Sequence, residues 1–86
     1  MSWLTRDQVK TVIVEALREV ADTGGDIEGY EIAELTDRHQ VVFMEKIAEK
    51  LGGRSFRVTM TLARLQGCST MAGLIDYIEE NQESKA

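Results

Sequence analysis

The stretch IAELTDRHQVVFMEKIAEKLGG, residues 32–53, decides the fold of this chain. Its apolar side chains recur every three or four residues, which predicts a helix, and Gly52 and Gly53 stop that helix. Thr36 stands where a capping residue is expected, so the helix is predicted over about 37–51 with its start open to solvent. The residues at that start are Thr36, Asp37, Arg38 and His39. These four polar side chains are the first candidate site.

Periodicity also predicts which side chains of this helix face the core. They are Val41, Met44, Ala48 and Leu51, with Phe43 and Ile47 beside them. Earlier in the chain, Thr5 and Gln8 have the spacing of a capping box, which predicts a first helix from Arg6 to shortly before Gly24 and Gly25.

The remaining segments complete a bundle. Residues 23–35 have no sustained period and predict a long loop with room for one helical turn, anchored by Ile27, Tyr30, Ile32 and Leu35. Residues 55–66 alternate like a strand but also fit a helix capped by Ser55; because no second strand-like run is present, we expect a helix. A last helix is expected over about 70–81, capped by Ser69. The expected fold class is all-α, a small four-helix bundle with a long loop between its first two helices.

Length and composition favour a binding module over an enzyme. The 86 residues allow one domain, 1–86, with 83–86 expected as a disordered tail. There is no run of about 20 apolar residues for a membrane span and no signal peptide at the start. Cys68 is the only cysteine, so an internal disulfide is impossible, which fits the cytoplasm. We expect a cytoplasmic monomer with no catalytic residues.

Charge is unevenly distributed along the chain. The net charge is −5, and there is no continuous basic face, which argues against a nucleic-acid partner. Residues 52–70 nevertheless hold Arg54, Arg57 and Arg64 and no acidic residue, so they are a second candidate surface, suited to an acidic partner. His39 has no second histidine or cysteine at ligand spacing, so no metal site is expected.

Two further stretches carry a resemblance to a known family. VKTVIVEAL (9–17) and STMAGLIDYIEENQ (69–82) resemble the first and last helices of the acyl carrier protein family. The resemblance implies a bundle whose second helix begins with a serine that receives 4′-phosphopantetheine, and whose partners are enzymes of a fatty-acid or polyketide-type synthase. Counting along the helices places that serine at Asp37, or at His39 if Leu35 is the anchor.

No serine occurs between Ser2 and Ser55. The resemblance therefore implies the carrier shape without its attachment point, and hence no cofactor. The family's second helix is also rich in acids, whereas residues 38–51 hold Glu45 and Glu49 against Arg38, Lys46 and Lys50. A simpler interpretation of Thr36 and Asp37, compatible with this one, is that they only cap the helix.

Ser55 offers an alternative. KLGGRSF (50–56) resembles the motif around the modified serine of peptidyl carrier domains, so Ser55 could hold 4′-phosphopantetheine in a working carrier. Only fourteen residues separate Ser55 from Thr70, which is too few for the rest of a second helix, a loop and a third helix. We therefore expect an interaction module that is not itself modified. A second alternative is a small regulatory or structural helical domain unrelated to acyl transfer.

Overall fold

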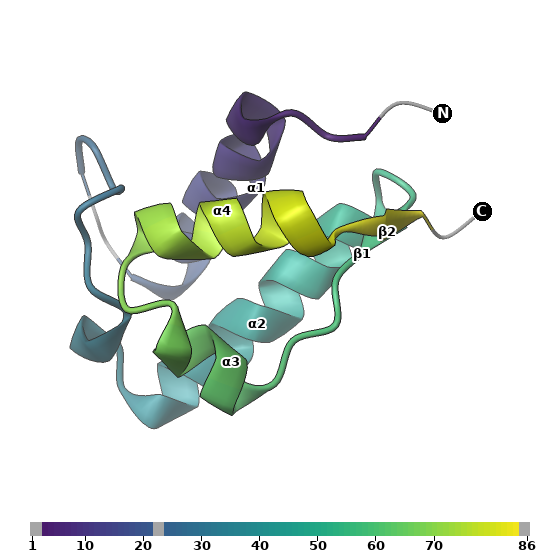
Figure 1. Cartoon of the computed structure of the whole chain (residues 1–86). Helices are drawn as coiled ribbons and strands as arrows, with labels where there is room; N and C mark the ends of the chain where they lie inside the picture. The colour runs from purple at the N-terminus through teal and green to yellow at the C-terminus, as the bar shows by residue number, and fades with distance from the viewer. Residues whose placement is uncertain (1–2, 22–23, 85–86) are drawn as a thin grey trace.

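The structure is a computed structural model, and it describes residues 3–21 and 24–84. These residues form a mostly helical fold with a short two-stranded ribbon at one end (Figure 1). The elements are α1 (Arg6–Val20), the 3₁₀ turn η1 (Ile32–Glu34), α2 (Asp37–Gly52), β1 (Phe56–Arg57), α3 (Leu62–Gly67), α4 (Met71–Asn81) and β2 (Glu83–Ser84).

Threonine caps begin the helices. The Thr5 and Gln8 capping box is present at α1, and the Thr36 hydroxyl accepts a hydrogen bond at the start of α2, so both predicted starts are confirmed. The last helix is capped by Thr70 rather than by Ser69. Ser69 has a φ of 66° in the turn before the cap, a left-handed conformation that is incompatible with the extended backbone of an N-cap.

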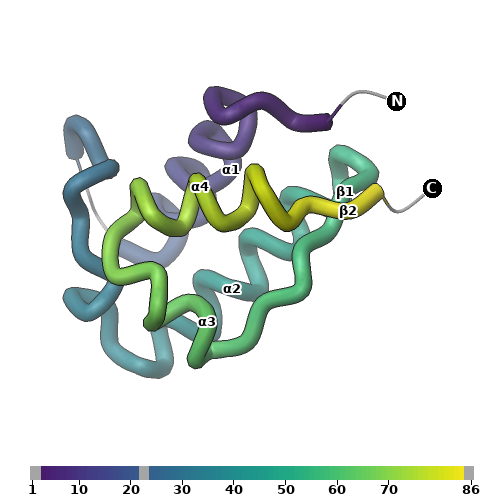
Figure 2. The backbone as a smooth tube through the Cα atoms, in the orientation of Figure 1, coloured from purple at the N-terminus to yellow at the C-terminus, as the bar shows by residue number. Residues whose placement is uncertain are grey.

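The core lies where α1 packs against α2 and α4. Figure 2 shows α4 crossing in front of α1, with α2 and α3 below. The apolar side chains that are less than 2% exposed come from all four α-helices and the long loop: Val9, Val12, Ile13, Ala16, Leu17, Ile32, Phe43, Ile47, Leu51, Leu65, Met71, Leu74, Ile75 and Ile78. Burial of each large side chain contributes roughly 1.5–3 kcal/mol.

The predicted inward face of α2 is confirmed for Phe43, Ile47 and Leu51, and it is wrong for Val41 and Ala48. The buried positions are Gln40, Phe43, Ile47 and Leu51, whereas Val41 and Ala48 are exposed and Met44 is half-buried. Positions 41, 44 and 48 have helical spacing just as positions 40, 43 and 47 do, so periodicity alone could not separate the two groups. The set that contains the bulkier Phe43 and Ile47 is buried, and it includes a glutamine that a purely apolar pattern passes over.

The helix expected over 55–66 is also wrong for most of its length. Phe56 and Arg57 form a strand that pairs antiparallel with Glu83 and Ser84, and α3 begins only at Leu62, after a Thr61 cap. Ser55 does not cap a helix, because it has a φ of 67° in the turn that follows α2. The pairing strand lies in the segment 83–86 that was expected to be a disordered tail; residues 85–86 lie outside the described residues.

The long loop is held by backbone pairing as well as by apolar anchors. Ile27, Ile32 and Leu35 are buried as expected, and Tyr30 is half-buried. The carbonyls of Glu28 and Tyr30 accept hydrogen bonds from the first residues of α4, and the Ile32 N–H donates to Ser69. The loop is therefore fixed where it leads into α2. In the described part of the chain, no helix combines the length and apolar character that crossing a membrane requires.

Candidate functional site

The start of α2 brings together four of the predicted site residues. Thr36, Asp37, Arg38 and His39 are all exposed, and the Thr36 hydroxyl accepts a hydrogen bond from the His39 N–H at 3.2 Å. Asp37 is the first residue of the helix, where the partial positive charge of the helix dipole favours a carboxylate. We call these four residues the α2 start.

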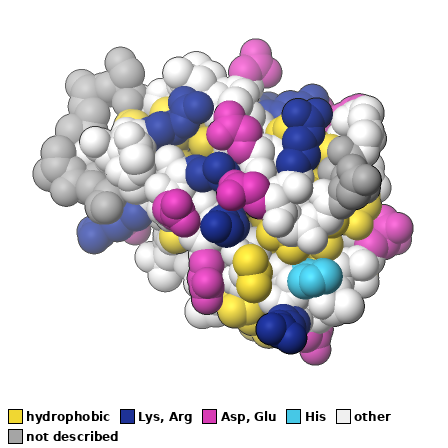
Figure 3. Space-filling model, turned by 180° about the vertical axis from the view of Figure 1, so that it is seen from behind, with side chains coloured by type: hydrophobic (Ala, Val, Ile, Leu, Met, Phe, Trp, Pro, Cys, Tyr) yellow, Lys and Arg dark blue, Asp and Glu magenta, His cyan; other side chains and the backbone are white. Residues whose placement is uncertain are grey.

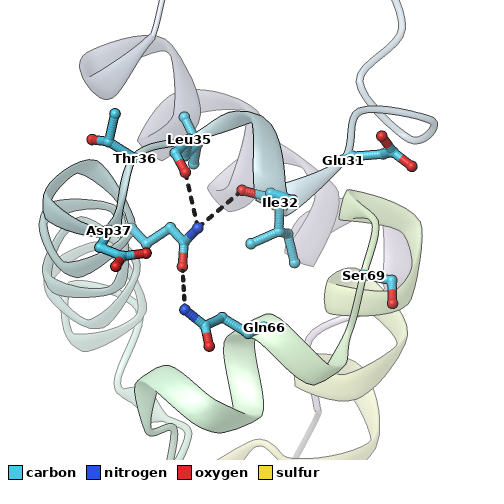
Figure 4. A pocket seen from close by; sticks show the side chains of 9 residues that line it. Glu31, Ile32, Leu35, Thr36, Asp37, Gln66 and Ser69 are labelled. Atoms are coloured by element: carbon cyan, nitrogen blue, oxygen red, sulfur yellow. Dashed lines mark hydrogen bonds between the residues drawn. The ribbon is translucent and has the colours of Figure 1, made fainter.

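A hollow of about 450 Å³ opens beside the α2 start. Figure 4 shows Asp37 and Thr36 on one side of it and Glu31 and Ser69 on the other. Its lining residues are Glu31, Ile32, Ala33, Leu35, Thr36, Asp37, Gln40, Gln66 and Ser69. Two carboxylates line this space, and none of the described residues that line it is basic, so it suits a neutral or cationic group better than an anion.

Gln40 lines this hollow and ties three elements together. Its side chain is 3% exposed. Its amide nitrogen donates to the carbonyls of Ile32 at 3.2 Å and Leu35 at 2.9 Å, and its amide oxygen accepts from Gln66 of α3 at 3.0 Å. The α2 start is thereby fixed against η1 and α3. Sequence reasoning missed both glutamines, although Gln40 lies three residues before Phe43 on the buried stripe.

The three arginines of residues 52–70 do not form one surface. Arg54 follows the carboxyl end of α2, and Arg57 on β1 pairs with Glu83 at 3.4 Å. Arg64 lies in α3, two residues before Gln66, which contacts the first turn of α2. The 16 residues of α2 span roughly 24 Å between these two regions.

The lysines of α2 are engaged by α1. Lys50 Nζ lies 2.6 Å from Glu19 Oε2 and 3.8 Å from Glu15, and Lys46 lies 3.7 Å from Glu19. The hydrogen bond with Lys50 lowers the pKa of Glu19 and raises the pKa of Lys50. Acidic and basic side chains are intermixed on the back of the molecule (Figure 3). The exposed face of α2 therefore presents no single-sign patch.

The alternative attachment residue, Ser55, occupies a different environment. It follows the carboxyl end of α2, and its N–H donates to the Gly52 carbonyl at 3.1 Å. A phosphodiester there would face the negative end of the helix dipole. Asp37, in contrast, stands at a positive end. Among residues 3–21 and 24–84, no group of three or more His, Cys, Asp or Glu side chains is placed to hold a metal ion.

Comparisons of the chain with protein-family models, with curated proteins and with solved structures found no match. The assignment of a function therefore depends on the residues and on their geometry.

Proposed function

We propose that this chain is a carrier-like protein-interaction module of a fatty-acid or polyketide-type synthase, and that it does not itself carry 4′-phosphopantetheine. The observation that carries the proposal is the exposed α2 start, with Asp37 as its first helical residue after a long pinned loop. The order of elements, a long first helix, a long loop, a second helix, a short helix and a last helix, supports the same interpretation.

The chemistry explains why Asp37 matters. In a carrier, the serine hydroxyl attacks the pyrophosphate of coenzyme A; a phosphodiester forms, 3′,5′-ADP leaves and the hydroxyl proton is released. A carboxylate at this position accepts no such arm, but it keeps a negative charge at the positive end of the helix. Asp37 then acts as a partial electrostatic substitute for the phosphate.

Partner enzymes would contact the α2 start and the adjoining hollow. Arg54 and Arg57 lie at the far end of α2 and Arg64 on α3, so they form secondary contacts in this proposal. Replacing all three arginines with glutamate should weaken binding to a purified synthase domain less than replacing Asp37 and Arg38 with alanine. A larger loss of binding in the arginine variant would instead place the binding surface at the three arginines.

The experiment that tests the proposal restores the missing hydroxyl. Wild type, Asp37→Ser, Asp37→Ala and Ser55→Ala are each incubated with coenzyme A and a broad-specificity phosphopantetheinyl transferase, and intact masses are measured. We expect Asp37→Ser alone to gain one phosphopantetheine. The Asp37→Ala variant controls for loss of the carboxylate without gain of a hydroxyl.

Two results would overturn the proposal. A mass gain on the wild type that disappears in Ser55→Ala would make this chain a working carrier modified at Ser55. No gain on an Asp37→Ser variant with native circular dichroism would favour a regulatory or structural helical domain unrelated to acyl transfer.

A further inference from the structure

We infer that a second binding site lies at the carboxyl end of α4, away from the hollow beside the α2 start. It takes an arginine side chain of a partner polypeptide between Trp3 and the carboxylates of Glu79 and Glu80. The inference does not depend on the proposed function. It begins from Trp3, the only tryptophan of the chain, which is 55% exposed. Its ring centroid lies 6.0 Å from that of Phe56, at an interplanar angle of 48°. Phe56 is nearly buried, so the indole packs against the edge of the core while about half of Trp3 stays exposed.

A hollow of about 430 Å³ adjoins this indole. Its lining consists of Trp3, Leu4, Glu79, Glu80 and Gln82. The Gln82 amide accepts from the Leu4 N–H at 2.9 Å, donates to the Leu4 carbonyl at 2.9 Å and donates to the Glu79 carbonyl at 3.0 Å. Figure 1 shows the first described residues running beside the end of α4. The hydrogen-bonding atoms of the Gln82 amide are thus occupied within the protein. The indole of Trp3 and the carboxylates of Glu79 and Glu80 are left to bind a ligand.

Two glutamates line this hollow. Within the described part of the chain, neither Glu79 nor Glu80 has an ion-pair partner, whereas nearby Glu83 is paired with Arg57. Among residues 3–21 and 24–84, no basic side chain lines the space. The complementary group is therefore a cation.

The indole narrows the choice of cation. A guanidinium group is planar, stacks on an aromatic face and donates several hydrogen bonds to carboxylates in a fixed fork. A lysine ammonium would satisfy the charge but would not use the flat surface of Trp3 in the same way. The apolar methylene groups of an arginine side chain can also pack beside Leu4 at the edge of the hollow.

The test uses the ¹⁵N-labelled full chain and the capped tripeptide Gly-Arg-Gly. Because there is one tryptophan, the indole N–H signal of Trp3 is unique and reports this site directly. We expect a saturable shift of this signal, with a dissociation constant in the range of about 1–10 mM, that weakens as salt is added. The control peptide replaces arginine with citrulline, which has nearly the same shape and no charge; it should give no saturable shift.

Paired variants separate the site from general charge. Glu79→Gln/Glu80→Gln should weaken binding about fivefold or more, and the matched pair Glu45→Gln/Glu49→Gln on α2, with the same change in net charge, should leave it within about twofold. Equal losses in both pairs, equal shifts with citrulline, or no saturable Trp3 shift up to about 50 mM peptide would each overturn the inference.

Discussion

Gly73 lies in the first turn of α4, where the backbone of the preceding turn passes very close. A Cβ at this position would lie closer to the Cys68 carbonyl oxygen than real Cβ atoms approach such an atom. The contact is with backbone, which cannot rotate away, and the Thr70 cap bonds to the Gly73 N–H. The glycine is required by this close approach rather than by an unusual φ.

We expect Gly73→Ala to lower the free energy of unfolding by about 1–3 kcal/mol, because the turn before α4 must shift. Gly67→Ala is the matched control, since Gly67 is also helical and a Cβ there would meet nothing within 4 Å. That change should be neutral or stabilising by up to about 1 kcal/mol. Urea denaturation of both variants measures the difference; equal effects would contradict the steric explanation.

In α2, the side of the helix on which a residue lies decides how much that residue contributes to the stability of the protein. Ile47 is 1% exposed, whereas Val41, which has the same branching at Cβ, is 40% exposed. Ile47→Ala should cost about 2–5 kcal/mol through lost burial and a residual cavity. Val41→Ala should stay within about 0.5 kcal/mol of wild type. Comparable losses, measured by chemical denaturation, would contradict the burial of Ile47 and the exposure of Val41.

Gln40 links α2 to η1 and α3, so substitutions in its hydrogen-bond network test how these elements are held together. Gln40→Leu leaves the Leu35 carbonyl without its donor and should cost about 1–3 kcal/mol. Gln66→Ala should cost about 1 kcal/mol or less, since water from the adjoining hollow can reach the Gln40 oxygen. Unfolding free energies of the two variants test this order, and a larger loss in Gln66→Ala would reverse our interpretation of the network.

The sequence predicts elements where a local signal is strong. Thr5 and Thr36 fix two helix starts because a cap and an apolar period coincide. The ribbon could not be predicted, because Phe56 and Arg57 pair with Ser84 and Glu83, 28 and 26 residues further along the chain, and two-residue strands carry no period. The exposed α2 start was predictable from its cap. The hollow beside it was not, because it depends on how η1, α2 and α3 meet.

At the scale of the whole molecule, a cluster of charges joins α1 to the long loop. Glu28 accepts hydrogen bonds from Lys10 Nζ and Arg6 Nη2, both at 2.8 Å, and Arg6 also reaches Asp76 of α4 at 3.1 Å. These bonds, chiefly that from Lys10, lower the pKa of Glu28 from 4.5 to about 2. The loop that positions the α2 start is thus held by ionised groups.

A pH dependence follows from the sign of this shift. Because the folded pKa of Glu28 lies below its usual value of 4.5, the stabilisation is present above pH 4.5 and is lost as the pH falls towards 2. Glu28→Gln should lower the thermal midpoint at neutral pH, and its midpoint should converge with that of wild type near pH 2. Glu45→Gln, which removes an exposed carboxylate, is the control. Parallel curves for Glu28→Gln and wild type down to pH 2 would contradict the role of this cluster.

The Gln82 side-chain oxygen accepts a hydrogen bond from the Leu4 N–H at 2.9 Å, although the two residues are 78 positions apart. The next two residues form β2, which pairs with β1. Because the two ends of the fold are bonded to each other, a short peptide could join them into a closed ring. New ends could then be cut at Gly53 in the turn after α2. Such a circular permutant would keep every helix intact while reversing which half of the bundle leaves the ribosome first.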